Sequence, residues 1–226
     1  MTMPYVDEKF GKVPKGWSYL KLKDECQGLG EYGANASAVD HRAGYPRYIR
    51  ITDIDDQGNL IEEGKVGIEP EKVKNNILKE NDFLFARTGD TVGKSLLYKE
   101  HMGLAAYAGY LIKFSFKFDL ILPEYFNLIA RSDYFDAFIT AMKRIGAKPN
   151  INSREYGSFR FILPDELSEQ VTIYEIFIPI NKFIMEKQAK IRILQRLKKS
   201  LMQHLLTGKV QVDVDKINNT LKEQEE

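Results

Sequence analysis

Residues 165–208, DELSEQVTIYEIFIPINKFIMEKQAKIRILQRLKKSLMQHLLTG, decide the fold of this chain. Apolar side chains recur there in alternating steps of four and three residues, the heptad pattern of a helix with one apolar seam. Lys187 and Lys198 occupy two positions of the series. We expect a single helix, roughly 60 Å long at about 1.5 Å per residue. The apolar seam residues are Ile173, Phe177, Ile180, Ile184, Ile191, Leu194, Leu201 and Leu205.

The two ends of this stretch carry helix signals. Acidic residues open it and basic residues close it before Gly208, which suits the helix dipole and a left-handed glycine at the end. Pro179 lies inside the pattern and has no backbone N–H to donate. We therefore expect a kink or a break near Phe177.

The apolar seam needs a second helix to cover it, because the turns of one helix cannot cover their own side chains. A core helix docked on the preceding domain is one interpretation. However, no other segment of this sequence has a helical pattern of comparable length. Pairing with a second copy of the chain is the interpretation we favour.

Composition sets broad limits on function. The 226 residues are 43% hydrophobic and 29% charged, which is ordinary for a globular protein. A single cysteine, Cys26, excludes an internal disulfide framework and predicts a reducing, cytoplasmic location. Three scattered histidines give no reason to expect a metal site. No apolar run is long enough for a membrane span and no signal peptide opens the sequence, so we expect no membrane association.

Charge is distributed unevenly although the net charge is only +1. Residues 186–209 hold seven Lys or Arg and one acid, and residues 140–160 hold five and one. Local basic faces, rather than the total, determine the field that a phosphate backbone meets. An exposed, solvated helix face would have the same composition, so charge alone does not decide the partner.

Residues 1–164 have the pattern of a β-rich domain. Alternating, β-branched segments predict strands at 47–54, 81–87, 95–98, 107–116 and 159–163. Residues 123–143 predict a helix, and Ser153 is expected to cap a short turn. Residues 28–43 and 144–152 are rich in loop-forming residues. The predicted fold class is α+β: a β-rich mixed globular domain (1–164), one long coiled-coil-type helix (165–208) and a polar, acidic tail (209–226).

Catalytic motifs are missing from the sequence. The segment GDTVGKS at 89–95 has three residues between its glycines, where a Walker phosphate loop needs four. There is no nucleophile elbow, no HExxH, no CxxC and no Asn-Pro-Pro-Tyr stretch of the adenine methyltransferase type. We therefore predict no catalytic site and no cofactor in this chain.

Four parts of the sequence carry a family resemblance. They are VPKGW (13–17), FLFARTGDTVGK (83–94), GAKPNIN (146–152) with FILP (161–164) and EQ (169–170), and LQRLKKSLMQHLLTGK (194–209). In these parts the chain resembles half of a specificity subunit of a type I restriction–modification enzyme. The last part is the most specific, because the family ends its spacer helix in nearly these residues.

The resemblance implies different roles for the globular domain and for the long helix. Residues 1–164 would be a target recognition domain that reads one half of a bipartite double-stranded DNA site. The long helix would be a spacer that fixes the distance between half-sites. The chain would be non-catalytic and would dock methyltransferase subunits, which use S-adenosylmethionine. Through them it would meet a restriction subunit, which uses ATP and Mg²⁺.

The size of the chain departs from the family pattern. The usual specificity subunit has two recognition domains and two antiparallel spacer helices, whereas this chain has one of each. A homodimer would restore that arrangement and read two identical inverted half-sites. Pairing with a different half-size chain, or a truncated gene, are alternatives.

Candidate DNA-contacting residues lie in the loops beside the resembling segments. Arg and Lys pair with guanine or phosphate, and Asn pairs with adenine, so these types are the ones expected to contact DNA. The candidates are Arg42, Arg47, Arg87, Lys94, Lys148, Asn150, Asn152 and Arg154.

Two other functions stay open from the sequence. An enzyme, such as a methyltransferase fragment or a nuclease, would require motifs that this sequence lacks. A coiled-coil interaction module without a DNA role would have the same long helix. Salt separates that module from a DNA-specificity subunit, because phosphate contacts make DNA affinity fall steeply with salt concentration.

Overall fold

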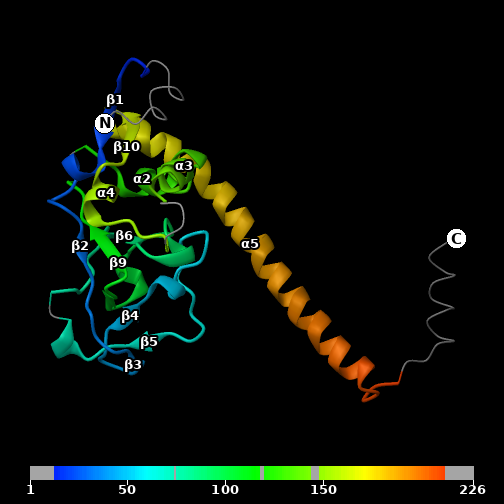
Figure 1. Ribbon diagram of the computed structural model, residues 1–226. Helices are drawn as coiled ribbons and strands as arrows, with labels where there is room; N and C mark the ends of the chain where they lie inside the picture. The colour runs from blue at the N-terminus through cyan, green and yellow to red at the C-terminus, as the bar shows by residue number, and fades with distance from the viewer. Residues whose placement is uncertain (1–12, 74, 118–119, 144–147, 212–226) are drawn as a thin grey trace, which may run out of the picture. The chain divides into compact units, whose positions relative to one another are not determined.

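The computed structural model describes residues 13–73, 75–117, 120–143 and 148–211 (Figure 1). By its contacts the chain divides into two compact units, Met1–Tyr174 and Glu175–Glu226. The division by contacts falls after Tyr174, inside the long helix. The domain bounds given from the sequence, with a first domain at 1–164, stay a prediction. The predicted acidic tail lies almost entirely outside the described residues.

A four-stranded antiparallel sheet forms the centre of unit 1, in the order β2-β9-β6-β7. Its middle strand β6 reads Phe83-Leu84-Phe85-Ala86 and is buried on both faces. Because side chains alternate along a strand, Phe83 and Phe85 enter one apolar cluster, whereas Leu84 and Ala86 enter another. The strands are β2 (Glu31–Tyr32), β6 (Phe83–Ala86), β7 (Ser95–Leu97) and β9 (Leu111–Phe114).

Three helices contribute to the aromatic cluster around Phe83 and Phe85. The ring of Phe85 lies 5.3 Å from that of Phe135 and 4.6 Å from that of Tyr156, both nearly parallel to it. The single helix predicted at 123–143 is wrong in detail, because the chain turns between two helices and Ser132 caps the second one. The helices are α2 (Pro123–Ile129), α3 (Asp133–Met142) and α4 (Ser153–Gly157).

A second four-stranded sheet has the order β3-β5-β4-β8, and its β4 and β8 run parallel. Ile49, Ala105 and Tyr107 of this sheet pack with Leu84 and Ala86 of the first sheet. The strand predicted at 47–54 is shorter than expected, because β4 ends at Ile49. The strand predicted at 107–116 is divided between the end of β8 and β9, and the loop predicted at 28–43 contains the two short strands β2 and β3. The strands are β3 (Val39–Asp40), β4 (Arg47–Ile49), β5 (Val66–Gly67) and β8 (Ala105–Tyr107).

Strand β1 (Trp17–Lys21) pairs with β10 (Arg160–Pro164) in an antiparallel ladder of five residue pairs, from Trp17 opposite Pro164 to Lys21 opposite Arg160. Figure 1 shows these two strands beside the start of the yellow helix. The first and last strands of unit 1 therefore lie side by side. Short 3₁₀ turns complete the unit: η1 (Leu22–Asp24), η2 (Ile51–Asp53), η3 (Pro70–Lys72), η4 (Gly89–Thr91) and η5 (Glu100–Met102).

Helix α5 (Leu167–Leu206) is 40 residues long, which confirms the long helix predicted from the heptad pattern. Gly208 has φ +69°, the left-handed conformation expected at the end of the helix. Of the kink or break predicted near Phe177, the break is wrong, because the helix continues through Pro179, and the kink stays a prediction. Within unit 2, Lys187 extends over the ring of Phe183 at 4.7 Å.

The α+β fold class predicted from the sequence is confirmed, with β-rich sheets followed by one long helix. Among the described residues, none of the helices combines the length and the apolar character needed to cross a bilayer.

Candidate nucleic-acid interface

Two of the segments that carried the family resemblance lie against each other in unit 1. The Ile151 amide donates to the Arg87 carbonyl at 2.9 Å, and the Gly89 amide donates to the Pro149 carbonyl at 2.9 Å. Thr88 and Asn150 form a β-bridge between them. This pairing brings the predicted residues Arg87, Lys148 and Asn150 together on adjacent loops.

Glycine at position 89 follows from this pairing. Its φ is +67°, a conformation that other residues rarely adopt. A Cβ there would lie 3.6 Å from Cε of Lys148, so the aliphatic part of Lys148 extends past this turn. Lys148 and Asn150 are exposed. The loop therefore offers a cation and an amide to solvent at one place.

The Arg87 side chain is half-buried and held by an aromatic ring. Its guanidinium carbon lies 4.8 Å from the ring centroid of Tyr32, a cation–π contact. Its Nε is buried and has no hydrogen-bond partner in the described part of the chain. Among the described residues, none of the carboxylates forms an ion pair with Arg87. Among the described carboxylates, the guanidinium therefore has no counter-ion.

Helix α4 fixes two further predicted residues. The Asn152 side chain accepts from the Glu155 amide at 2.9 Å, and the Glu155 carboxylate accepts from the Asn152 amide at 2.8 Å, a reciprocal capping box. The sequence predicted Ser153 as the cap, and this is wrong because the capping residue is Asn152. Ser153 instead donates its hydroxyl to the Gly30 carbonyl at 2.8 Å. Arg154, in the first turn, is exposed.

The other predicted cations have local partners elsewhere in unit 1. Arg47 is 5% exposed, and its guanidinium donates to the Glu62 carboxylate and to the Ile61 carbonyl. The hydrogen bond from Arg47 lowers the pKa of Glu62. Because this guanidinium is buried and already bonded, the structure favours a structural role for Arg47, and we leave it out of the candidate interface.

Arg42 and Lys94 are also separate from the paired loops. The Arg42 guanidinium lies over the Tyr45 ring at 4.0 Å, in a pocket that it shares with Arg47. Lys94 donates to the Ile54 carbonyl at 3.3 Å and pairs with the Asp56 carboxylate at 2.8 Å. Lys94 therefore connects the turn at residues 89–94 to the loop at residues 54–56.

Two tyrosines of this region were missed from the sequence. Tyr32 supports Arg87, and Tyr110, which is 61% exposed, lines a groove on unit 1 together with Tyr32 and Arg87. The sequence placed Tyr32 in a loop rich in Gly and Ala, where no period marks a strand. The only local signal was an aromatic residue between two glycines, Gly30 and Gly33.

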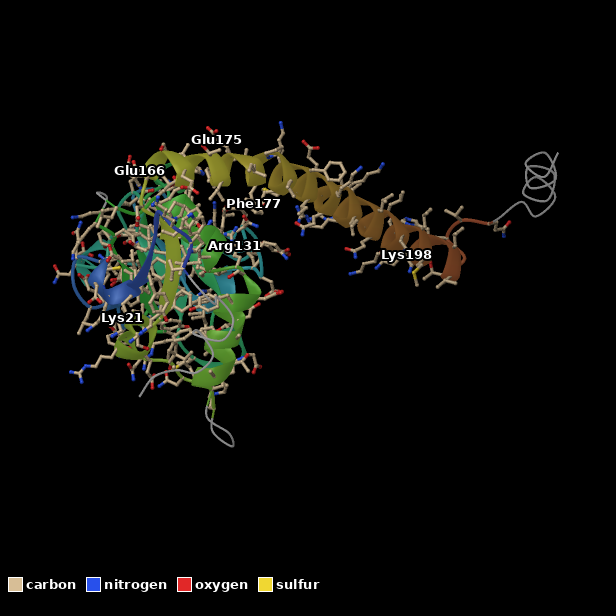
Figure 2. The ribbon with its side chains drawn as sticks, turned by 90° about the horizontal axis from the view of Figure 1, so that it is seen from above. Lys21, Arg131, Glu166, Glu175, Phe177 and Lys198 are labelled. Carbon is tan, nitrogen blue, oxygen red and sulfur yellow. The ribbon has the colours of Figure 1, made fainter. Side chains whose placement is uncertain are left out.

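Helix α5 carries the predicted seam. In unit 2 the side chains stand along the length of the helix, as Phe177 and Lys198 show in Figure 2. Ile173 differs from the other seam residues, because it is partly buried against the aromatic core of unit 1. The remaining seven are between 40% and 52% exposed: Phe177, Ile180, Ile184, Ile191, Leu194, Leu201 and Leu205.

Comparison with known proteins gives a likeness in structure. No family model matches the sequence. The HsdS subunit from Thermoanaerobacter tengcongensis matches with a TM-score of 0.60 at 20% identity, over 85% of this chain and 49% of that chain. The type I restriction–modification S subunit from M. genitalium matches with a TM-score of 0.57 at 11% identity, over 86% and 46%. This chain has the fold of type I specificity subunits.

A third match is a chain from a structure that describes complex assembly and conformational transition of the type I R-M system. Its TM-score is 0.59 at 17% identity, over 85% of this chain and 48% of that chain. This chain spans about half the length of each of these three structures. The resemblance stated from the sequence and the likeness in fold therefore point to the same group of proteins.

Proposed function

We propose that this chain is a DNA-specificity subunit of a type I restriction–modification system and that unit 1 reads one half of a bipartite DNA site. The fold shared with type I S subunits over at least 85% of the chain carries this proposal. The pairing of the Arg87 and Asn150 loops supports it, because that pairing gathers groups that bind phosphates and base edges.

The chain acts as a non-catalytic scaffold in this proposal. Methyltransferase subunits bind to it and supply S-adenosylmethionine chemistry. A restriction subunit, with ATP and Mg²⁺, joins through them. The complex works on DNA in the cytoplasm.

The spacer helix pairs with the same helix of a second copy in this proposal. Seven seam residues are half exposed, and one apolar face of this length is stabilised when a matching face covers it. This chain covers only about half the length of each structure that it resembles. Two copies would supply two reading domains, and the twofold axis would make the two half-sites inverted repeats of each other.

Methylation mapping of host DNA tests the proposed function. The genome is mapped with the gene intact, deleted and restored. Deletion is expected to remove methylation from one bipartite motif whose halves are inverted repeats, and restoring the gene should bring it back. An unchanged methylation pattern after deletion would refute the role in DNA specificity. A lost motif with two different halves would keep that role and refute pairing with an identical copy.

A further inference from the structure

A groove of about 660 Å³ runs beside Arg87 on unit 1. Much of its lining has no side chain beyond Cβ, so a ligand can approach the protein backbone closely. At Gly33 a Cβ would lie 2.3 Å from the Ala108 carbonyl oxygen, which only glycine avoids. The larger side chains of the groove include Tyr32, Arg87 and Tyr110.

Arg87 is fixed in this groove through its backbone and its ring contact. Its amide donates to the Tyr110 carbonyl at 3.0 Å, and its carbonyl accepts from the Ile151 amide. The Tyr32 ring beneath its guanidinium is itself held, because the Tyr32 hydroxyl accepts from the Ser153 amide at 3.2 Å. The other arginine of the groove, Arg50, is bonded twice to the Asp53 carboxylate. Within the described residues, Arg87 is therefore the arginine of this groove that has no carboxylate partner.

Two features of a DNA duplex can pair with such a guanidinium, namely a guanine edge and a backbone phosphate. A guanine edge lies at the bottom of a major groove about 8.5 Å deep, so a side chain must protrude from the protein to reach it. Arg87 is half-buried and lines a depression instead. The sugar–phosphate backbone forms the ridges of the duplex, and a ridge fits into a depression.

We propose that this groove holds the DNA backbone, with one phosphate on the Arg87 guanidinium and with Tyr32 as a positioning residue. This inference rests on the proposed function. Within that function it gives phosphate binding and base reading to different residues. Arg87 anchors the domain on the duplex without reading sequence. Base contacts come from exposed residues of the neighbouring loop, such as Lys148 and Asn150.

Salt titrations on the full chain bound to its methyltransferase subunit test the proposal. Affinity is measured for the cognate duplex and for one with a scrambled half-site, over a series of KCl concentrations. Arg87→Gln is expected to weaken binding about tenfold on both duplexes. The slope of log K against log salt should become shallower by about 0.9 for each phosphate that Arg87 neutralises in the wild type. Arg87→Lys keeps the charge, so its slope should match that of the wild type while affinity for both duplexes falls.

Arg160→Gln is the matched control. Arg160 also extends over a tyrosine, at 5.6 Å from the Tyr19 ring, but it does not line this groove. Its substitution should change neither affinity nor slope, and the melting temperature of each variant shows whether it is folded. If Arg87→Gln does not fold, Arg87→Lys alone gives the comparison between the two duplexes.

Three results would count against these ideas in different ways. A weakening confined to the cognate duplex would make Arg87 a base reader and overturn the proposal. If Arg87→Gln changes the DNA affinity and the salt slope no more than Arg160→Gln does, Arg87 does not bind a phosphate and the proposal is wrong. If the wild-type complex binds neither duplex, the proposed DNA-specificity function fails, and the groove proposal fails with it.

Discussion

Tyr156 is the residue that joins the central sheet to the turn preceding Lys94. Its hydroxyl donates to the Ala86 carbonyl at 2.6 Å and accepts from the Gly93 amide at 3.1 Å. Its ring stacks on Phe85, and burial raises the pKa of its phenol. Because Ala86 directly precedes Arg87, this tyrosine helps to fix the backbone from which the anchoring arginine extends.

Tyr156→Phe is expected to lower the free energy of unfolding by about 1–2 kcal/mol. The ring packing would remain, but the buried groups that the hydroxyl satisfied would lose a partner. Urea denaturation measures the change. Tyr110→Phe, at a side chain that is 61% exposed, is the control and should stay within about 0.5 kcal/mol of the wild type. Equal effects for the two variants would contradict the role given to the Tyr156 hydroxyl.

Cys26 gives a prediction that depends on pH. It is 2% exposed, and burial raises its pKa to about 12. A raised thiol pKa stabilises the fold below the ordinary thiol pKa, and this contribution is lost as pH rises toward 12, because the unfolded chain releases its proton first. The stability difference between wild type and Cys26→Ala should therefore shrink between pH 8 and pH 11. A difference that is constant with pH would show that the native thiol ionises normally.

Residue types in loops predicted part of the candidate interface. Arg87, Lys148 and Asn150 were named from their motifs, and the structure places them on paired loops. Tyr32 and the burial of Arg47 could not be predicted, because both depend on pairing between strands far apart in sequence. A loop position alone does not tell whether a cation meets solvent or a carboxylate.

At the scale of elements, Gln170 fastens the first turn of α5 to its surroundings in unit 1. Its side chain is fully buried. Its amide donates to the carbonyls of Leu120 and Pro164, both at 2.9 Å, and its oxygen accepts from the Leu122 amide at 2.9 Å. One side chain thus connects the helix start, the end of β10 and the loop before α2.

Gln170→Leu is expected to destabilise the protein by about 3 kcal/mol, because one buried and two partly buried backbone groups would lose their partner. Thermal and urea unfolding of unit 1 measure the loss. Gln57→Leu makes the same chemical change at an exposed turn position and should be nearly neutral. If the two substitutions cost the same, the backbone groups around Gln170 must find other partners.

Sequence patterns predicted long elements better than short ones. The heptad period over forty residues was enough for α5, and alternation was enough for β6. Strands of two residues, such as β2, contain no full period, so only their partner strand defines them. The single helix predicted at 123–143 missed Ser132, whose capping hydroxyl starts a new helix and divides that pattern.

At the scale of the whole molecule, the proposed pairing of two chains predicts a change in mass. Leu201 lies on the α5 seam, and Gln203 lies about 200° around the helix from it. Leu201→Asp should convert a dimer into a monomer, because a carboxylate would be buried in an apolar contact. Gln203→Asp adds the same charge on the opposite face and should leave the dimer intact.

Light scattering after size-exclusion chromatography distinguishes these outcomes. A wild-type chain that remains monomeric at high concentration would rule out pairing with an identical copy. A dimer that both variants leave unchanged would place the contact somewhere other than the seam.

The ladder between β1 and β10 has a consequence for how such proteins change. The two ends of the proposed recognition domain lie next to each other in five facing residue pairs, and helix α5 starts just after β10. A segment from residue 22 to residue 159 could be exchanged for another of different length and leave this ladder in place, provided that the new segment again offers backbone groups to Gln170 as Leu120 and Leu122 do. If unit 1 reads DNA as proposed, recombination at these two junctions would change the DNA target, while helix α5 and its heptad phase would stay the same.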